Sequence, residues 1–419
     1  MGSVAAYEAL STETLKARLS DVVTLAEKVG PDASAWSVRE VGDGNLNLVF
    51  IVQGPKGSVI VKQALPFVRV VGDSWPLPLY RAFYEFHALR RQAERDPGSV
   101  PEVYHFDGNQ ALIVMEFLSP HVILRRKLIN GERVGGLADR IGTFCARTAF
   151  RGSELCMKSA DKKADVAMFA GNVEIPAITE GLVFTAPYFD AERNHYTKAL
   201  HPAVMALRDN TDIKIRVQRM KMKFASNTET MIHGDLHSGS IMATDHEAKV
   251  IDPEFAQYGP LGFDIGMLTA NYLMAYFSQP AHRGDDLDVY QDWLLSVIVD
   301  TFAAFRTEFT RLWHTERTGM LYPHSLFEDQ GQPSDAACDS VLHEIWTNAV
   351  SICGIEMLRR VLSFAHNADF EDIKDEAVRA RLEARNLMMG QDLILNAQSI
   401  PDVDALCALA RDYNAKDML

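Results

Sequence analysis

The chain has 419 residues, of which 47% are hydrophobic and 23% are charged, so it can bury the cores of two or three domains and is not typical of a disordered or fibrous protein. Its net charge of −14 excludes nucleic acid as a partner of the surface as a whole, although a local nest of amides and cations could still bind an anionic nucleotide. Five widely spaced cysteines without a Cys-x-x-Cys pair, a polar N-terminus and no apolar run long enough for a bilayer predict a soluble, cytoplasmic protein without a membrane partner.

The part of the chain before Ser119 is rich in predicted strands that are separated by glycine-rich turns. Short runs with β-branched residues predict the strands, and an apolar period near 3.6 predicts one helix. The predicted strands are Ser37–Val41, Leu48–Gln53, Ser58–Lys62, Glu102–Phe106 and Ala111–Met115, and the helix is Leu79–Arg95. Three strands, a helix and two further strands follow one another in the order of a protein kinase N-lobe.

After Pro120 the chain becomes mostly helical, so the sequence predicts an α+β fold with a boundary near Glu116–Pro120. A polar stretch with Gly and Pro, Leu321–Ser334, predicts a surface loop. The predicted helices are Leu137–Phe150, Gly262–Ser278, Val289–Trp313 and Val341–Ala365, and three short β-like runs are Thr230–Ile232, Ile241–Met242 and Lys249–Ile251.

The run His233-Gly234-Asp235-Leu236-His237 follows one of these β-like runs. Phosphoryl transfer to an alcohol needs a carboxylate beside the attacking hydroxyl, and Asp235 is the candidate. Protein kinases have a magnesium-binding Asn five residues after this base, whereas this chain has Ser240. The two histidines have the four-residue spacing of zinc ligands on a helix, but the glycine and the preceding strand favour structural hydrogen bonds instead.

Asp252-Pro253-Glu254 lies seventeen residues after Asp235, directly after a β-like run, where protein kinases have Asp-Phe-Gly. Asp252 could bridge magnesium to the phosphates, and Glu254 adds a second hard oxygen ligand. Taken alone, these carboxylates could simply begin a solvated turn. Their spacing from His-Gly-Asp favours a metal site.

Lys62 ends the third predicted strand, in the position of the lysine that binds nucleotide phosphates in kinases, and Glu85 is its expected ion-pair partner. Gly42–Asn47 lies where a kinase Gly-rich loop lies but does not follow Gly-x-Gly-x-x-Gly. Asn45 and Asn47 would reach the nucleotide through their amides or a left-handed backbone. Taken alone, the lysine could be a solvated edge charge and the loop a plain hairpin turn.

Two further features have no counterpart in the general kinase pattern. Val70–Leu77 is predicted to be a loop, and its Trp75 could cover the site as part of a lid, or the loop could simply pack on the surface. Arg359 and Arg360 lie on a predicted helix, where neighbouring residues point about 100° apart, so we expect them to be buried unequally. One of them could stabilise the charge on the transferred phosphate, or the pair could form a solvated face.

Together these residues resemble the family of 5-methylthioribose kinases, within the superfamily of aminoglycoside and choline kinases. In that family Ser replaces the metal-binding Asn and Asp-x-Glu replaces Asp-Phe-Gly, as in this sequence. The resemblance spans nearly the whole chain and includes Gly42–Asn47, Val61–Gln63, Val71–Leu77, His233–Ile241, Asp252–Phe255, Tyr258–Gly266 and Glu356–His366.

The resemblance implies a bilobal protein-kinase-like fold with a strand-rich, nucleotide-binding lobe at residues 1–117 and a mainly helical, catalytic and substrate-binding lobe at residues 118–419. It implies ATP-dependent phosphorylation of the 1-hydroxyl of 5-methylthioribose in methionine salvage, with Mg²⁺ as the metal and a homodimer as the assembly. The implied base is Asp235, and the implied metal ligands are Asp252 and Glu254. The implied ATP contacts are Asn45, Asn47, Lys62, Met115, Glu116, Phe117, Asp252, Pro253 and Glu254, and the implied substrate contacts are Asp235, Arg359, Arg360 and Trp75.

Two alternatives remain open on the sequence. The chain could phosphorylate another alcohol, such as a different sugar, an aminoglycoside or choline, although paired arginines argue against a cationic acceptor. It could also be a pseudokinase that binds a nucleotide without catalysis, as the altered glycine loop and Ser240 would allow. Retention of Lys62, Asp235 and Asp252 favours an active enzyme.

Overall fold

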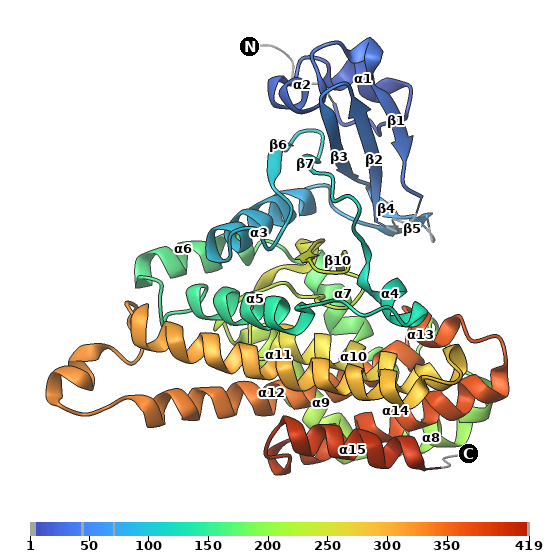
Figure 1. Cartoon of the computed structure of the whole chain (residues 1–419), viewed down its shortest axis with the longest axis vertical. Coiled ribbons are helices and arrows are strands. Elements are labelled where there is room, and N and C mark those ends of the chain that lie inside the picture. Colours follow the sequence, from blue (N-terminus) through green and yellow to red (C-terminus); the bar gives the residue numbers. More distant parts are fainter. Residues whose placement is uncertain (1–5, 43–45, 70–71, 417–419) are drawn as a thin grey trace. The chain divides into compact units, whose positions relative to one another are not determined.

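A computed structural model describes residues 6–42, 46–69 and 72–416, and the chain divides into two compact units (Figure 1). The first unit consists of Met1–His121, Asn172–Ile175 and Lys249–Ala256. The second consists of Val122–Gly171, Pro176–Ala248 and Gln257–Leu419. The assignment of functions to lobes 1–117 and 118–419 remains a prediction.

The first unit is built on an antiparallel sheet with the strand order β1-β2-β3-β7-β6. All five predicted strands and the predicted helix are confirmed to within two residues at each end. The strands are β1 (Ser37–Glu40), β2 (Asn47–Gly54), β3 (Gly57–Ala64), β6 (Val103–Asp107) and β7 (Leu112–Glu116), with the pair β4 (Phe67–Val68) and β5 (Gly72–Pro76), and the helices are α1 (Thr14–Leu19), α2 (Val23–Val29) and α3 (Arg81–Arg95).

Alternate residues of β2 and of the first half of β3 form one buried core. Phe50 and Val52 of β2 and Val59 and Val61 of β3 are fully buried in one core with helix α2. Because successive side chains of a strand point to opposite faces, Lys62 lies on the face away from this core. The apolar pattern thereby places a cation in the middle strand of the sheet.

One expectation for this unit was wrong, and two helices were not predicted. Helices α1 and α2 precede the sheet, and they were not predicted because six and seven residues are too few to show a helical period. The expected loop Val70–Leu77 contains strand β5, which pairs with β4. Strand β5 contains Gly72 and Pro76, two residues that normally indicate a turn.

The second unit is mainly helical, as predicted. Helix α7 (Glu174–Leu182) and strand β11 (Ala248–Val250) have residues in both units. The elements of the second unit are α4 (Leu124–Asn130), α5 (Leu137–Arg151), α6 (Ser159–Phe169), α8 (His201–Asp209), α9 (Thr211–Ser226), α10 (Phe263–His282), α11 (Leu287–Thr315), α12 (Asp335–Leu362), α13 (Ala368–Glu371), α14 (Glu376–Asn396), α15 (Val403–Ala415), β8 (Val122–Ile123), β9 (Thr230–Ile232), β10 (Ile241–Ala243) and β12 (Gln257–Gly259).

Helix α10 is the centre of this unit, where it packs against α11, α12 and α14 (Figure 1). All its residues from Ile265 to Gln279 are buried, which is typical of a helix surrounded by other helices. No single helix among the described residues is long and apolar enough to cross a membrane. Only the pair Ser159–Phe169 with Glu174–Tyr188, bent by 77°, meets that condition together.

Gly266 allows α10 and α12 to approach each other closely. A Cβ atom at this position would lie 2.6 Å from the carbonyl oxygen of Ala349 and 2.9 Å from Cβ of Ile352. Both neighbours belong to the rigid part of α12, so a larger residue would push the two helices apart. The spacing of α10 and α12 therefore depends on this glycine.

We expect Gly266→Ala to lower the free energy of unfolding by about 1–3 kcal/mol, the usual cost of overpacking a core. Urea denaturation of the purified protein measures this change. Gly181→Ala is the matched control, because a Cβ in that helix would have no atom within 4 Å and should leave stability unchanged or slightly higher. Equal denaturation midpoints for Gly266→Ala and the unchanged chain would contradict the packing argument.

Candidate active site

The residues predicted to carry the chemistry divide between the two units, and each set is described within its own unit. Asn45 lies outside the described residues. The first unit contains Asn47, Lys62, Trp75, Met115, Glu116, Phe117, Asp252, Pro253 and Glu254, and the second contains Asp235, Arg359 and Arg360.

Lys62 is a buried cation on β3, the middle strand of the sheet. Its Nζ donates to Oε1 of Glu85 on α3 and to Oδ1 of Asp252, both at 2.6 Å. The predicted ion pair with Glu85 is therefore confirmed. Burial alone would lower the pKa of Lys62, but the nearby carboxylates, Asp252 first, outweigh it and raise that pKa above its ordinary value. Lys62 is thus a permanent ammonium.

Asp252 lies two residues after the end of strand β11 and has a left-handed backbone, φ 62° and ψ 47°. This conformation is uncommon for a residue other than glycine, although Asp adopts it more readily than most, and such residues cluster at functional sites. A short 3-10 turn, Pro253–Phe255, follows. The side-chain amide of Asn172 donates to the carbonyl oxygens of Glu254 and Ala256 at 3.1 and 3.0 Å. These contacts fix a loop that carries two carboxylates two residues apart.

Arg81 is fully buried and joins this loop to the turn before β2. Its guanidinium donates to the carbonyl oxygens of Leu46 and Leu65 and, at 3.1 Å, to Oδ1 of Asn47. Its Nε lies 3.6 Å from Oε2 of Glu254, which also accepts from Nδ2 of Asn47 at 3.3 Å. The sequence analysis missed Arg81, because a helix rich in charged residues gives no sign of which one is buried.

Met115, Glu116 and Phe117, which the resemblance implies as ATP contacts and which we call the hinge, lie at the end of β7. Met115 is buried, and the amide of Glu116 donates to the carbonyl oxygen of Glu102 at 2.8 Å. The carboxylate of Glu116 pairs with Lys249 at 2.8 and 2.9 Å, which links the hinge to strand β11. Phe117 is half-buried.

Trp75, the predicted substrate contact of the first unit, lies in strand β5 rather than in a loop. Its side chain is half-buried. A residue in a hydrogen-bonded strand is more restricted than one in a loop, so the predicted covering role of Trp75 would require movement of the whole β4–β5 pair.

In the second unit, the loop that carries Asp235 begins where strand β9 ends. The carboxylate of Asp264, in the first turn of α10, accepts the backbone amides of His233 at 2.7 Å and Gly234 at 3.1 Å. Gly234 has a φ of 86°, which a residue with a side chain would rarely adopt. The loop is therefore anchored to the central helix immediately before the candidate base.

Ser240 closes the other end of this loop. Its Oγ accepts the amide of His237 at 2.8 Å and lies 3.0 Å from the carbonyl oxygens of both Asp235 and His237. Ser240 is buried, with an exposed fraction of 3%. The hydroxyl group of Ser240 thus bonds to the backbone of its own loop. At the position where protein kinases have a metal-binding Asn, this chain has a residue that fixes the loop.

Arg359 and Arg360 both lie beside the candidate base. Their Nη2 atoms are 3.5 and 3.3 Å from Oδ1 of Asp235. Burial alone would raise the pKa of Asp235, but the contact with His237 and the two guanidinium charges hold that pKa well below its usual value. The carboxylate is therefore ionised at neutral pH.

The expectation that the two arginines are buried unequally was wrong, because both have an exposed fraction of 6%. The reason is Glu356, one turn earlier on α12. Its two carboxylate oxygens accept Nε of Arg359 at 2.9 Å and Nε of Arg360 at 2.5 Å. Glu356 is itself completely buried. It draws both guanidinium groups to one side of the helix.

Glu356 was missed by the sequence analysis, although a signal for it was present. Residues three and four positions apart on a helix are neighbours, so Glu-x-x-Arg-Arg places one carboxylate beside both arginines. The pattern alone does not distinguish a buried clamp from the ion pairs common on solvated helices.

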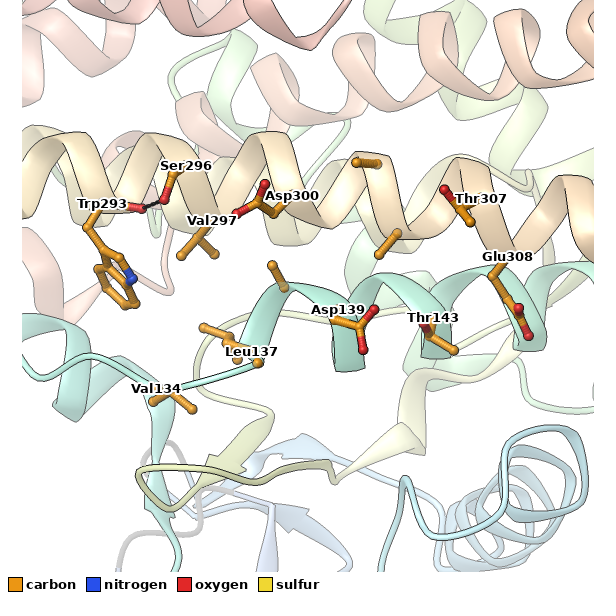
Figure 2. A pocket seen from close by; sticks show the side chains of 14 residues that line it. Val134, Leu137, Asp139, Thr143, Trp293, Ser296, Val297, Asp300, Thr307 and Glu308 are labelled. Carbon is orange, nitrogen blue, oxygen red and sulfur yellow. Dashed lines mark hydrogen bonds between the residues drawn. The ribbon is translucent and has the colours of Figure 1, made fainter.

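A groove of about 530 Å³ lies between α5 and α11 in the second unit (Figure 2). None of the predicted site residues lines it. Its carboxylates are Asp139, Asp300 and Glu308, and the last of these is paired with Arg147 and Arg311 at 2.6 and 2.7 Å. We therefore place the candidate chemistry at the motif residues and not in this groove.

Comparison with known proteins identifies the family. A model described as "Phosphotransferase enzyme family" matches residues 37–294. A methylthioribose kinase of Escherichia coli O45:K1 (strain S88 / ExPEC) is 41% identical over 413 residues, covering 97% of this chain and 98% of the relative. The chain belongs to the methylthioribose kinase family. Methylthioribose kinase 1 of Oryza sativa subsp. japonica is 38% identical, covering 97% of this chain and 96% of the relative.

A methylthioribose kinase of Geobacillus sp. (strain WCH70) is 39% identical and covers 92% of this chain and 93% of the relative. Among solved structures, a glucosamine kinase in complex with glucosamine, ADP and inorganic phosphate is 16% identical and has a TM-score of 0.48. The match covers 90% of this chain and 85% of that chain. Membership in the methylthioribose kinase family confirms the predicted family, the α+β fold class and the prediction that the chain is a kinase, and a kinase implies the use of ATP.

We expect Glu356→Gln to lower the free energy of unfolding by about 3–5 kcal/mol, because it leaves two buried guanidinium groups without their main counter-charge. Urea denaturation measures this loss. Glu344→Gln on the same helix is the control, since Glu344 is 67% exposed in its pair with Lys223 and should change stability by less than about 1 kcal/mol. Similar losses for the two variants would contradict the clamp.

Proposed function

We propose that the chain transfers the γ-phosphoryl group of ATP to the 1-hydroxyl of 5-methylthioribose and so forms 5-methylthioribose 1-phosphate and ADP in methionine salvage. The identity of the substrate is inferred from the relatives named methylthioribose kinase, which share 38–41% identity over 97% of the chain. The observation that carries the chemistry is an ionised Asp235 beside two buried arginines. A base next to fixed cations is what transfer of an anionic phosphoryl group to a hydroxyl requires.

In this proposal Asp235 orients the acceptor hydroxyl and accepts its proton as the new oxygen–phosphorus bond forms. Arg359 and Arg360 stabilise the charge that develops on the transferred group, and they also contact the sugar. Trp75 contributes a further contact to the sugar.

On the nucleotide side, the ammonium of Lys62 binds the phosphates. Asn45, Asn47 and Pro253 are further contacts of the nucleotide. The segment Met115–Phe117 meets the adenine through its backbone.

We further propose Mg²⁺ as the metal, held by Asp252 and Glu254. Two carboxylates on one fixed loop are a hard oxygen donor set, which Mg²⁺ prefers together with phosphate oxygens. The ion would neutralise phosphate charge when bound. Asp252 and Glu254, which contact Lys62 and Asn47 respectively, would hold the ion.

We propose a cytoplasmic homodimer that binds neither nucleic acid nor membrane. All five cysteines are free and four of them are buried, which suits a reducing compartment. The dimer is carried over from the family, and light scattering of the purified protein tests it. A mass of one chain at micromolar concentration would exclude the dimer.

Release of ADP, followed by a coupled assay, should be fastest with 5-methylthioribose among a panel that includes ribose, choline and an aminoglycoside. The relatives named methylthioribose kinase are the reason for this expectation, and the paired arginines further disfavour the cationic choline and aminoglycoside. Faster turnover of another acceptor would overturn the proposed substrate, and no ADP release with any acceptor would favour the pseudokinase.

Asp235→Asn should reduce turnover by about 10²–10⁴-fold, the usual contribution of a general base, and should leave nucleotide binding within a few fold. Steady-state kinetics and calorimetric titration with ATP measure the two quantities. Asp300→Asn in the groove of Figure 2 is the control and should turn over normally. Normal turnover of Asp235→Asn would exclude Asp235 as the base.

Glu254→Gln should raise the Mg²⁺ concentration needed for half-maximal activity by about tenfold or more, because an amide is a poorer ligand for a hard cation. The Michaelis constant for the sugar should change less. Glu94→Gln on α3, a 63% exposed partner of Arg90, is the control. An unchanged magnesium requirement would remove Glu254 from the metal site.

A further inference from the structure

His237 has both ring nitrogens engaged, and their partners determine where its proton lies. Nδ1 is 2.9 Å from the backbone nitrogen of Gly239, whose N–H can only donate. Nδ1 must therefore accept, so it carries no proton in a neutral ring. The proton is on Nε2, which faces Oδ2 of Asp235 at 3.3 Å. The one proton of the neutral ring is therefore on the side that faces the candidate base.

The surroundings of His237 keep the imidazole neutral. Burial is the main cause that lowers the pKa of His237, and the positive charges of Arg360 and Arg125 lower it further. Together these effects outweigh the attraction of Asp235, and the pKa is about 4. Near pH 7 the ring is uncharged. It is therefore a neutral hydrogen-bond donor and not a third cation beside the two arginines.

Gly239 lies directly against the imidazole ring of His237. A Cβ atom at this position would lie 2.7 Å from Cε1 and 2.9 Å from Nδ1 of His237, and also 2.9 Å from a guanidinium nitrogen of Arg125. The imidazole is therefore in close contact with the backbone of its own loop. A methyl group on Gly239 would displace the ring, the guanidinium group of Arg125 or both, while the imidazole itself would be retained.

The two oxygens of Asp235 have different partners. Oδ1 faces the guanidinium groups of Arg359 and Arg360, whereas Oδ2 faces the neutral N–H of His237. A charged donor withdraws more electron density from a carboxylate oxygen than a neutral donor does. Oδ2 is therefore the more basic of the two oxygens.

We propose that His237 is a positioning residue for phosphoryl transfer, which donates Nε2–H to Asp235 and so presents Oδ2 as the atom that accepts the proton. This inference rests on the proposed function. In the step itself the acceptor O–H bond breaks and its proton moves to Oδ2. The acceptor oxygen bonds to the γ-phosphorus, and the bond to the bridging oxygen breaks, with its electron pair leaving on ADP. His237 neither gains nor loses a proton, because the lone pair of Nδ1 is occupied by Gly239.

Substitutions separate positioning from general base catalysis. His237→Leu removes the donor and should lower kcat by about ten- to a hundredfold, the usual value of a hydrogen bond to a charged group, with KM for both substrates within a few fold. His237→Gln retains a donor at the position of Nε2 and should recover most of that loss. Gly239→Ala should resemble His237→Leu, and Gly181→Ala should have no effect. A His237→Gln variant as slow as His237→Leu, or a His237→Leu variant with unchanged kcat, would overturn the inference.

A spectroscopic measurement tests the same inference on the unchanged protein. In ¹⁵N NMR, the ring signals of His237, identified by their absence in His237→Gln, should show a neutral ring protonated at Nε2 between pH 5 and 8. A titration near the ordinary value of 6.5, or a proton on Nδ1, would refute the proposal. Normal turnover of Asp235→Asn would instead refute the proposed function. An inactive Asp235→Asn together with a fully active His237→Leu would refute only the role of His237.

Discussion

Buried charges that must be compensated determine where the candidate catalytic groups lie. A guanidinium or ammonium group inside a protein is costly unless a carboxylate lies beside it, and removal of one partner leaves the other uncompensated. Lys62 in the first unit and the pair Arg359 and Arg360 in the second are buried in this way. Each has carboxylate partners on a different element or one helical turn away, so each cation is held by the fold.

In each unit, one buried residue outside the candidate catalytic and binding groups holds those groups in place. Arg81 contacts Asn47 and Glu254, which are distant in sequence but adjacent in the first unit. Glu356 does the same for the two arginines of α12. Fixed charges of this kind stabilise a transition state well because they need little reorganisation during the reaction. Activity should therefore depend on residues that a search for catalytic motifs does not reveal.

The sequence predicted those features that short stretches of chain determine. The β-branched run Val59–Val61 indicates the strand that carries Lys62, and Glu85 on the following helix was expected as its ion-pair partner. The burial of Arg81 could not be predicted, because it depends on carbonyl groups of Leu46 and Leu65 that only the folded chain brings together. The equal burial of Arg359 and Arg360 was missed for a related reason. It depends on Glu356, which is itself buried where α10 and α14 pack against α12, and periodicity within one helix does not show that packing.

Ser240 has a consequence for how such a site can change in evolution. Its hydroxyl joins the backbone on both sides of His237 to the carbonyl of Asp235, so the serine belongs to the architecture of the loop. A single exchange for the Asn of protein kinases would disrupt these three contacts before it could contribute a metal ligand. A change at position 240 would therefore first alter the backbone that places Asp235, whatever it did for metal binding.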